Sequence, residues 1–265
     1  MSVALQLSVV IPCINGLPYI GECLSSLENQ KGGIEAEIIV VSCCRDKTND
    51  YIRDHFPTVI LLEIPERLGI PELRARGASQ ASGDIIVMTQ DHCLVSENWF
   101  LEIVKAHTKK YHVVGGAIES KCTDRIVDWA AYLCEYSHVM LPFSLEETEH
   151  VPGNNASYRR EVLDRIEDHM KKNYWEFFIH KEMKKAGVRF LLEPSMVVFH
   201  KMKFGFFAFM SQRFHYSRSF AGMRNTTMCL AGRIGSIMFC PCLPILLAVR
   251  IAGQVFHKKR HRRRF

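Results

Sequence analysis

The chain has 265 residues, of which 48% are hydrophobic and 23% are charged, and these proportions exclude collagen-like, coiled-coil and wholly disordered chains. The formal net charge is +6, but seven of the 34 Lys and Arg residues and none of the 28 acidic residues lie between Arg250 and Phe265. The rest of the chain is close to electrically neutral, which argues against nucleic acid as a partner.

The first half of the chain alternates between short apolar runs and stretches with helical periodicity. The apolar runs are rich in β-branched residues and bounded by Gly, Pro, Asn or charged residues, which is the pattern of buried parallel strands. They lie at residues 8–11, 37–41, 59–62, 84–88 and 113–114. Strands and helices in alternation at this spacing predict an α/β fold with a doubly wound, mostly parallel sheet flanked by helices.

Ligands bind such sheets beyond the carboxyl ends of the strands. Residues 12–15, 42–48 and 90–93 directly follow three of the predicted strands, so we expect the chemistry to lie there. In the third segment Asp91 stands beside His92, and a carboxylate next to an imidazole suits a divalent ion and its phosphate ligands. A polar turn that caps the next helix would show the same residues.

The second half of the chain is less regular. Its pattern predicts a helix over residues 124–136, a turn at 152–155 that leads into a strand, an amphipathic helix over 174–186 and a strand over 189–199. No internal repeat or low-complexity linker interrupts these elements. We therefore expect one domain over residues 1–222, followed by a C-terminal segment over residues 223–265.

The C-terminal segment joins an apolar stretch to a basic run. Residues 234–249 are uncharged, contain two prolines and are shorter than the ~20 residues that span a bilayer, so we expect a re-entrant or interfacial hairpin. Residues 258–264 are basic and suit an anionic membrane surface. Aromatic residues and cations interleave over residues 204–220, as they do at a lipid headgroup boundary. The alternative is an ordinary core stripe followed by a solvated tail.

Several polar residues each allow a functional and a structural interpretation. His200 ends an apolar strand, where it is either a structural histidine or a metal ligand that converges on Asp91. Glu176 begins the amphipathic helix, where it is either a catalytic carboxylate or a charge that the helix dipole favours. Arg74 and Arg76 either pair with phosphate or lie on a solvated helix face.

Common motifs of other enzyme classes are absent from the sequence. It has no P-loop, G-x-G-x-x-G, H-E-x-x-H or G-x-S-x-G segment, which excludes P-loop NTPases, dinucleotide dehydrogenases, zincins and α/β-hydrolases. The ten cysteines form no matched C-x-x-C pairs, so a structural zinc site is not expected. Free, buried thiols in a reducing compartment are the simplest interpretation.

Six segments, taken in order, resemble the family 2 glycosyltransferases of the GT-A fold. They cover the first strand and its loop, the second strand and its loop, the helix before the metal motif, the metal motif, the acceptor-side segment and the helix that carries the family's Glu-Asp pair. In this chain they read VVIPCIN at residues 9–15, VVSCCRDKT at 40–48, LRARGA at 73–78, QDHC at 90–93, PGNNASYRR at 152–160 and WEFFIH at 175–180.

The resemblance implies a nucleotide-diphosphate sugar as the donor. Its nucleotide would lie in the loops that follow the first two strands. The donor-binding residues that the resemblance implies are Pro12, Asn15, Ser42, Asp46, Arg74, Arg76 and Asp91. A divalent metal ion, Mg²⁺ or Mn²⁺, would be held by Asp91, His92 and His200.

The same resemblance implies the acceptor side and the location. Glu176 would be the base that deprotonates the acceptor hydroxyl in an inverting transfer. Asn154, Asn155 and His180 would contact a lipid-linked or glycan acceptor. Together with the C-terminal segment, this implies sugar transfer at the cytoplasmic face of the cell membrane, in the synthesis of a cell-envelope polysaccharide.

The chain departs from the family pattern at four positions. Ser42 replaces the usual base-binding Asp, Lys47 replaces a Gly, Gln90 replaces an acid of the metal motif, and Phe177 stands where an Asp is frequent. These departures keep open a catalytically degenerate scaffold that binds a nucleotide or a partner glycosyltransferase. A nucleotidyltransferase is a weaker alternative, because no Gly-rich phosphate loop follows the first strand.

Overall fold

The computed structural model describes residues 6–108, 110–166, 175–226 and 228–261. The chain divides into two compact units. Unit 1 comprises Met1–Glu119 and Phe143–Lys201, and unit 2 comprises Ser120–Pro142 and Met202–Phe265. These units do not follow the boundary expected at residue 222, because residues 120–142 and the aromatic segment that begins after Lys201 belong together.

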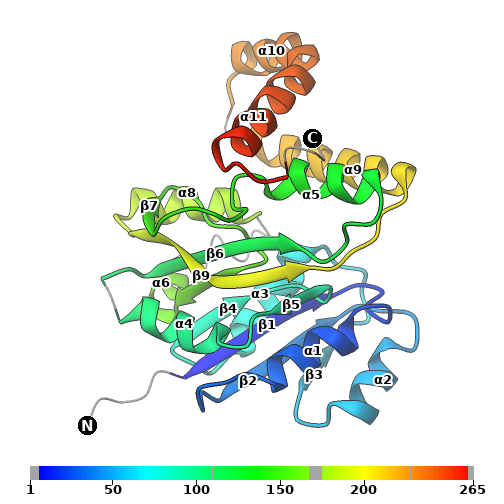
Figure 1. Cartoon of the computed structure of the whole chain (residues 1–265), viewed down its shortest axis with the longest axis vertical. Helices are drawn as coiled ribbons and strands as arrows, with labels where there is room; N and C mark the ends of the chain where they lie inside the picture. The colour runs from blue at the N-terminus through cyan, green and yellow to red at the C-terminus, as the bar shows by residue number, and fades with distance from the viewer. Residues whose placement is uncertain (1–5, 109, 167–174, 227, 262–265) are drawn as a thin grey trace. The chain divides into compact units, whose positions relative to one another are not determined.

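Unit 1 contains a nine-stranded sheet of order β3-β2-β1-β4-β8-β6-β9-β5, with β7 paired to β9 (Figure 1). Its strands are β1 (Leu7–Cys13), β2 (Ala36–Ser42), β3 (Ile60–Glu63), β4 (Ile85–Met88), β5 (Cys93–Val95), β6 (Val113–Ser120), β7 (Glu146–Thr148), β8 (Ala156–Arg159) and β9 (Phe190–His200). Strands β1 to β4 pair in parallel, as expected. Beyond β4 the pairs β4–β8, β8–β6, β9–β5 and β7–β9 are antiparallel, because β8 returns alongside β4 and β6 after the turn at residues 152–155.

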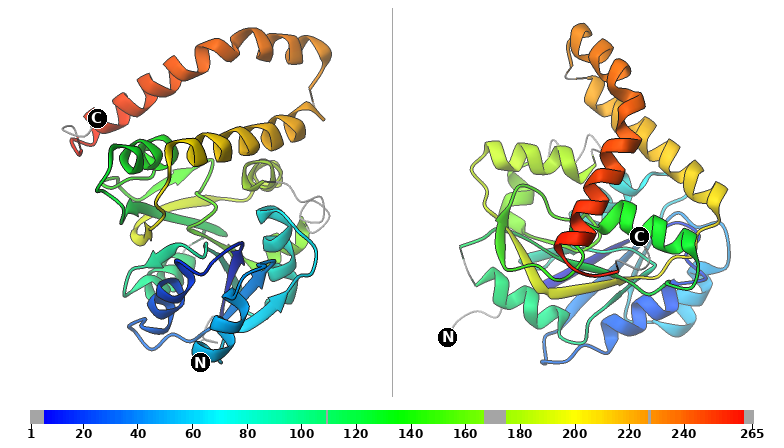
Figure 2. Two further views of the ribbon diagram at one scale, coloured as in Figure 1. Left: turned by 90° about the vertical axis from the view of Figure 1, so that its right-hand side faces the viewer. Right: turned by 45° about the horizontal axis from the view of Figure 1, so that its top comes forward.

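Helices cover both faces of this sheet (Figure 2). They are α1 (Ile20–Glu28), α2 (Thr48–His55), α3 (Ile70–Gln80), α4 (Trp99–His107), α6 (Arg160–Arg165) and α8 (Glu176–Lys185). In β1, Val9 and Ile11 share a core with α1, α2 and α4, whereas Val10 shares a core with α3, α6 and α8. Both faces of the strand are therefore buried, which explains its continuous apolar sequence.

Unit 2 is helical in its described residues. Its elements are α5 (Ile126–Tyr136), α9 (Phe206–Asn225), α10 (Leu230–Phe239), the 3₁₀ turn η1 (Cys240–Cys242) and α11 (Leu243–His257). Trp129, Tyr132 and Leu133 of α5 form a small core with Ile251 and Val255 of α11. This core fastens the end of the C-terminal helix to α5.

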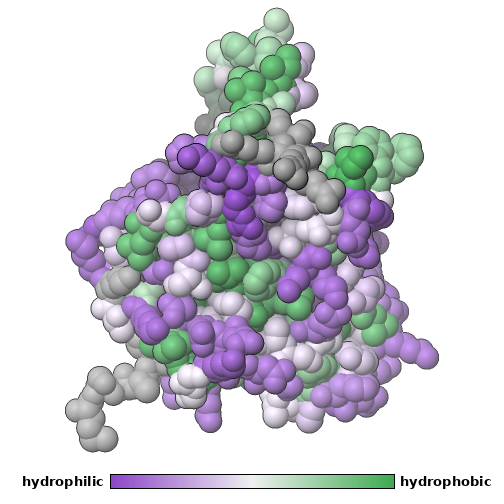
Figure 3. Space-filling model, in the orientation of Figure 1, coloured by the Kyte–Doolittle hydropathy of each residue, from purple (hydrophilic) through white to green (hydrophobic). Residues whose placement is uncertain are grey.

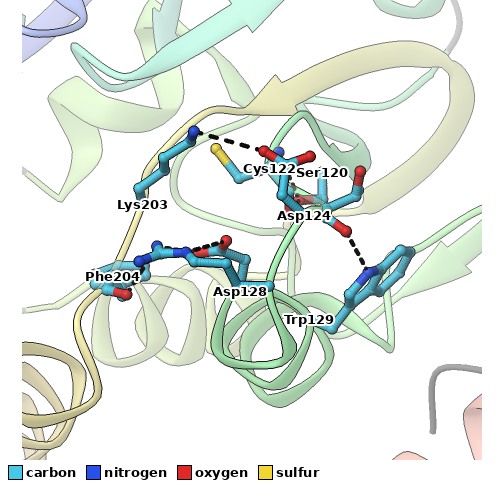
Figure 4. A network of polar contacts seen from close by, with 9 residues as sticks. Ser120, Cys122, Asp124, Asp128, Trp129, Lys203 and Phe204 are labelled. Atoms are coloured by element: carbon cyan, nitrogen blue, oxygen red, sulfur yellow. Dashed lines mark hydrogen bonds and ion pairs between the residues drawn. The ribbon is translucent and has the colours of Figure 1, made fainter.

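A polar network joins the start of α5 to the segment that leads into α9 (Figure 4). The Arg125 guanidinium donates two hydrogen bonds to the Asp128 carboxylate, at 2.9 and 2.6 Å, and a third to the Phe204 carbonyl at 3.0 Å. Lys203 Nζ lies 3.6 Å from a carboxylate oxygen of Asp124. These contacts connect two parts of unit 2 that are about eighty residues apart in the sequence.

The expected re-entrant hairpin at residues 234–249 is wrong. Helices α10 and α11 continue through η1 as one helical arm, Leu230–His257, of 28 residues, and its most apolar 18-residue window has a mean hydropathy of 2.0. By length and composition the arm suffices to cross a membrane. The helix extends past Arg233 and Arg250, which the uncharged stretch did not include. Its prolines do not break it, because Pro241 and Pro244 occupy the first turns of η1 and α11, where proline is tolerated.

Candidate functional site

The candidate site lies at the carboxyl ends of β1, β2 and β4, all in unit 1. Pro12 is buried within β1, and Asn15 is exposed in the loop that follows. Asn15 has a φ of 57°, a left-handed conformation that asparagine tolerates better than most residues. The Ile14 amide in the same loop donates to Asp91 Oδ2 at 3.4 Å, so this loop and the end of β4 are connected.

The end of β2 presents one buried and one exposed polar residue. The Ser42 hydroxyl donates to Asn49 Oδ1 at 2.6 Å and accepts the Cys44 amide at 3.2 Å. Ser42 is only 1% exposed, so its hydroxyl serves the loop itself. Asp46 is exposed, and its carboxylate accepts the Thr48 amide at 3.0 Å at the start of α2.

The structure brings together the three residues that the sequence analysis assigned to a metal ion. Asp91 Oδ1 lies 2.7 Å from His92 Nδ1, and Asp91 is 8% exposed. The imidazole rings of His92 and His200 pack edge to face with centroids 4.7 Å apart. Antiparallel pairing of β5 with β9 places Cys93 opposite His200 and so fixes this proximity.

The chemistry of this donor set fits a divalent ion only in part. One carboxylate and two imidazoles favour a transition metal over Mg²⁺, which prefers oxygen ligands. Within the described ranges, however, no three His, Cys, Asp or Glu side chains are arranged so that they could hold a metal by themselves. A metal ion here therefore needs further ligands, and phosphate oxygens of a substrate are the usual source.

Glu176 and Arg74 form a second polar pair in unit 1. Arg74 Nη1 donates to Glu176 Oε2 at 3.1 Å, and the two side chains are 10% and 26% exposed. Both line a cavity of about 30 Å³ together with Gly153 and Tyr158, which is room for about one water molecule. A Cβ at Gly153 would lie 2.6 Å from the Glu176 carboxyl carbon, so only glycine permits this close approach.

The two arginines of α3 have different surroundings. Arg74 is buried against Glu176, whereas Arg76 is exposed. The structure therefore separates two residues that the sequence analysis grouped as phosphate ligands. Arg76 keeps its guanidinium accessible to a ligand, and Arg74 does not.

Asn155 and His180 lie in the interior of unit 1. Asn155 donates to the carbonyls of Ala117 and Met196 at 2.8 and 2.9 Å and accepts the Trp99 indole N–H at 3.0 Å. His180 Nε2 lies 2.9 Å from the Tyr158 hydroxyl. Both side chains are fully buried, so their geometry supports a structural role rather than the acceptor contact that we expected.

Burial decides the charge of His180. It lowers the pKa of the imidazole to about 3, and the positive charges of His150 and Arg74 act in the same direction. The ring is therefore neutral at physiological pH.

Asn154 is also buried, at 4% exposed, with its amide nitrogen 3.8 Å from Cys93 Sγ.

A comparison with protein families identifies the chain. The model named Glycosyl transferase family 2 matches residues 8–167, which is more than half of the sequence. The chain belongs to this family. This confirms the resemblance that the six sequence segments indicated, and with it the class of enzyme.

Solved structures of this family's fold are similar to the chain. The mannosyltransferase PcManGT from Pyrobaculum calidifontis, in complex with GDP-Man and Mn²⁺, is 19% identical with a TM-score of 0.61 over 98% of this chain and 76% of that one. GalNAc-T7 with UDP, GalNAc and Mn²⁺ is 17% identical with a TM-score of 0.60, over 76% and 37% of the two chains. S. aureus TarS 1-349 in complex with UDP is 16% identical with a TM-score of 0.57, over 75% and 61%. These similarities confirm the GT-A fold.

One curated relative shows local sequence similarity. N-acetylgalactosaminyltransferase 7 of Drosophila melanogaster is 36% identical over 69 residues, which are 24% of this chain and 12% of the relative. The match therefore covers only a small part of that protein.

Sequence reasoning missed one feature of this glycosyltransferase. Cys13 ends β1 and Cys44 follows β2, and their sulfur atoms are 3.6 Å apart. The available signal was positional, because β1 and β2 are parallel neighbours and Cys13 is paired with Ser42, two residues before Cys44. Two thiols at the carboxyl ends of adjacent parallel strands are brought together by the fold.

Proposed function

We propose that this family 2 glycosyltransferase moves a sugar from a nucleotide-diphosphate donor to an acceptor hydroxyl with inversion, assisted by a divalent ion. The observation that carries the proposal is the placement of Asp91, His92 and His200 together at the carboxyl end of β4. Support comes from the GT-A proteins of similar fold, whose structures contain GDP-Man with Mn²⁺, or UDP.

The donor would lie along the loops that follow β1 and β2. Asn15, Asp46 and Arg76 offer exposed polar groups to its nucleotide and diphosphate, and Pro12 shapes the strand beneath them. Ser42 would act through the shape of the β2 loop, because its hydroxyl is already bonded to Asn49 and to the Cys44 amide. Arg74 is a positioning residue in this proposal, because it is bonded to Glu176.

The metal ligands on the protein side would be Asp91, His92 and His200. A bound divalent ion would supply charge neutralisation for the departing diphosphate. Asp91 already has both oxygens oriented, one by His92 and the other by the Ile14 amide. The imidazole nitrogens make Mn²⁺ the better candidate of the two ions.

Glu176 is the proposed base. It would take the proton of the acceptor hydroxyl while the acceptor oxygen forms a bond to the anomeric carbon and the bond from that carbon to the diphosphate breaks. Arg74 holds one carboxylate oxygen, and the Gly153 backbone leaves room beside the carboxyl group. Both contacts fix the direction of the base before the acceptor arrives.

We further propose that the enzyme acts on a lipid-linked or glycan acceptor at the cytoplasmic face of a membrane, in cell-envelope polysaccharide synthesis. The support is the helical arm, Leu230–His257, of whose most apolar 18-residue window only 6% is buried. Exposed apolar surface is visible on these C-terminal helices (Figure 3). Its large side chains include Ile234, Ile237, Met238, Phe239, Ile245, Leu246 and Val249.

The basic run contributes less charge to this surface than the sequence analysis assumed. Lys258 is buried, and its ammonium donates to the carbonyls of His138 and Met140. Arg260 donates to the Leu141 carbonyl at 2.9 Å. Lys259 is exposed, whereas residues 262–264 lie outside the described residues.

The rival function is a scaffold that binds nucleotide without transferring sugar. It is favoured by Ser42 and Gln90, which replace acidic residues of the family pattern, and by the internal use of the Ser42 hydroxyl. Hydrolysis of the donor separates the two functions, because a transferase releases some nucleoside diphosphate to water and a scaffold does not.

The test uses the full chain in detergent micelles with a panel of UDP- and GDP-sugars, each with Mn²⁺, Mg²⁺ or a chelator. We expect one class of donor to raise the melting temperature only when the metal is present, and to be slowly hydrolysed. Stabilisation without hydrolysis or transfer would favour the scaffold. No stabilisation by any donor, or full activity in excess chelator, would overturn the proposal.

A further inference from the structure

Cys13 and Cys44 form a close thiol pair in unit 1, beside the loop that carries Asn15. Their Sγ atoms are 3.6 Å apart, and the Asn15 amide donates to Cys44 Sγ with an N···S distance of 3.1 Å. Cys13 is fully buried, whereas Cys44 is partly exposed. Cys44 is therefore the member of the pair that solvent reaches, and the buried Cys13 sulfur lies within 4 Å of its sulfur.

The surroundings of the pair place the negative charge on Cys44. A hydrogen bond from Cys13 lowers the pKa of Cys44 to about 6 against the opposing effect of burial, with help from Ser42, Gly16 and Thr48. The Asn15 amide also donates to Cys44 Sγ, so Cys44 is the thiol of the pair whose ionised form its surroundings stabilise.

The other buried cysteines of unit 1 lack this combination of features. Burial raises the pKa of Cys93 to about 12, and burial also raises that of Cys23. Cys43, the direct neighbour of Cys44, is buried with its sulfur 3.8 Å from the Leu68 carbonyl. A thiolate that is reachable from solvent and has a second thiol within 4 Å is the arrangement of redox-sensitive cysteines.

We propose that Cys44 is a site of oxidation by hydroperoxides, and that Cys13 is its resolving thiol. The Cys44 thiolate attacks one peroxide oxygen, the O–O bond breaks, and Cys44 becomes a sulfenic acid while the other oxygen leaves as hydroxide or alkoxide. The Cys13 sulfur then attacks the Cys44 sulfur, and water leaves. Two thiols lose two electrons in total, and the peroxide gains them. The product is a Cys13–Cys44 disulfide that a thiol reductant reverses.

The disulfide would alter the loops where the donor is expected, and this consequence rests on the proposed function. A disulfide needs an S–S bond of about 2.05 Å, so the two sulfur atoms must approach each other and the Asn15 amide loses its thiolate partner. Asn15 holds a left-handed backbone conformation in that loop. We therefore expect the oxidised enzyme to bind nucleoside diphosphate at least tenfold more weakly.

The first experiment alkylates the reduced full chain with iodoacetamide between pH 5 and pH 8.5 and follows each cysteine by peptide mass spectrometry. We expect Cys44 to react half-maximally near pH 6 and, at pH 6.5, faster than the exposed Cys229. This measurement needs no variant. Equal or slower alkylation of Cys44 at pH 6.5 would overturn the proposal.

The second experiment treats the full chain with hydrogen peroxide and maps disulfides without reduction. We expect a peptide that links Cys13 to Cys44, lost in Cys44→Ser. In Cys13→Ser a sulfenic acid at Cys44 should be trapped by dimedone, and Cys43→Ser, the matched control, should retain the link. Absence of the link together with absence of the sulfenic acid contradicts the proposal.

Binding of UDP and GDP before and after peroxide, and again after dithiothreitol, completes the test. A link that forms and weakens nucleotide binding reversibly supports both the site and its consequence. If the link forms and neither form of the chain binds nucleotide, the proposed function fails while the oxidation site stands. If the link forms and nucleotide binding is unchanged, the inferred control of donor binding is wrong.

Discussion

Arg74 of α3 donates a hydrogen bond from Nη1 to Oε2 of Glu176, the first residue of α8, across 102 positions of sequence. The contact joins the helix that precedes β4 to the helix that precedes β9. The two side chains share a small cavity with Gly153, whose missing side chain makes the approach possible. The orientation of the proposed base is therefore set by a residue from a different part of the sequence.

The role of Glu176 is tested by Glu176→Gln, which preserves shape and removes basicity. We expect turnover to fall by roughly 10²–10⁴-fold with little change in donor affinity, because only proton transfer from the acceptor is lost. Initial rates at saturating donor and a separate donor-binding isotherm measure both quantities. Glu182→Gln, at a half-buried carboxylate of the same helix that pairs with Lys185, is the matched control. Unchanged turnover in Glu176→Gln would make this residue a structural cap of α8.

Arg74 and Arg76 are expected to give opposite kinetic effects. Arg74→Met removes the partner of the base, so we expect turnover to fall by about 10–100-fold and donor KM to stay close to that of the wild type. Arg76→Met removes an exposed cation of α3 that is proposed to bind the donor, so we expect donor KM to rise with turnover retained. Steady-state kinetics with varied donor separate the two. Identical effects of both substitutions would return Arg74 to the phosphate-binding role.

The local elements of the fold were accessible from sequence, and the antiparallel half of the sheet was not. Buried parallel strands at β1, β2 and β4 leave continuous β-branched runs, which a single sequence displays. The pairing of β8 between β4 and β6 depends on contacts far apart in the chain, and nothing in the local pattern of residues 156–159 encodes it. The sequence likewise did not reveal that the two prolines of the arm lie in the first turns of η1 and α11, where they leave the helix unbroken.

The candidate site was predictable to the extent that its residues follow strands. Asp91 and His92 were located by their position after β4, and their proximity to His200 follows from the pairing of β5 with β9. Asn155 and His180 could not be placed, because a polar residue within a family motif does not reveal whether its side chain points into the core. The role of each of these residues in the reaction stays a prediction, and the same holds for the other residues of the candidate site.

Asn155 is expected to matter for stability. Asn155→Ala leaves the Trp99 indole N–H and the carbonyls of Ala117 and Met196 buried without this partner, so we expect a loss of about 2–4 kcal/mol in the free energy of unfolding. Asn29→Ala, at an exposed helix end, should change it by less than about 0.5 kcal/mol. Denaturant titration of the full chain in detergent measures both. A normal stability with lost acceptor binding would restore the acceptor role of Asn155.

Two buried histidines predict a loss of stability in mild acid. Burial lowers the pKa of both His107 and His180 to about 3, with Arg159 and His112 adding to the effect at His107. A histidine has a pKa of about 6.5 in the unfolded chain. At pH values between this and the folded value of about 3, the unfolded chain binds protons that the folded chain does not. Stability is therefore full above pH 6.5 and falls as the pH decreases, by about 2 kcal/mol per histidine at pH 5.

Unfolding midpoints of the full chain at pH 7.5, 6 and 5 measure this dependence. His107→Gln keeps a partner for the Ser157 hydroxyl, which lies 2.8 Å from His107 Nε2, and removes one titrating group. We expect the difference between pH 7.5 and pH 5 to shrink by about 2 kcal/mol in this variant. His55→Gln, on the surface of α2, should leave the difference unchanged. Parallel pH curves for the wild type and His107→Gln would refute the interpretation.

The helical arm predicts membrane association that salt reverses only in part. We expect the full chain to sediment with anionic liposomes, and a chain without residues 228–265 to stay largely unbound. High salt should release only the fraction held by charge, because apolar contact is not screened. Removal of the arm also deletes Ile251 and Val255 from the core of unit 2, so a second variant is needed that keeps the chain intact.

That variant is Ile237→Asp with Leu246→Asp, at two side chains of the arm that are 72% and 60% exposed. Each carboxylate opposes burial in hydrocarbon by about 2.5–3.5 kcal/mol, so we expect the double variant to lose the salt-resistant fraction while its melting temperature stays close to that of the wild type. Leu145→Asp, an exposed leucine of unit 1, is the matched control and should sediment normally. If the wild-type chain stays in the supernatant with anionic lipid at low salt, or if the double variant resists the salt wash as the wild type does, the arm does not hold the enzyme on a membrane.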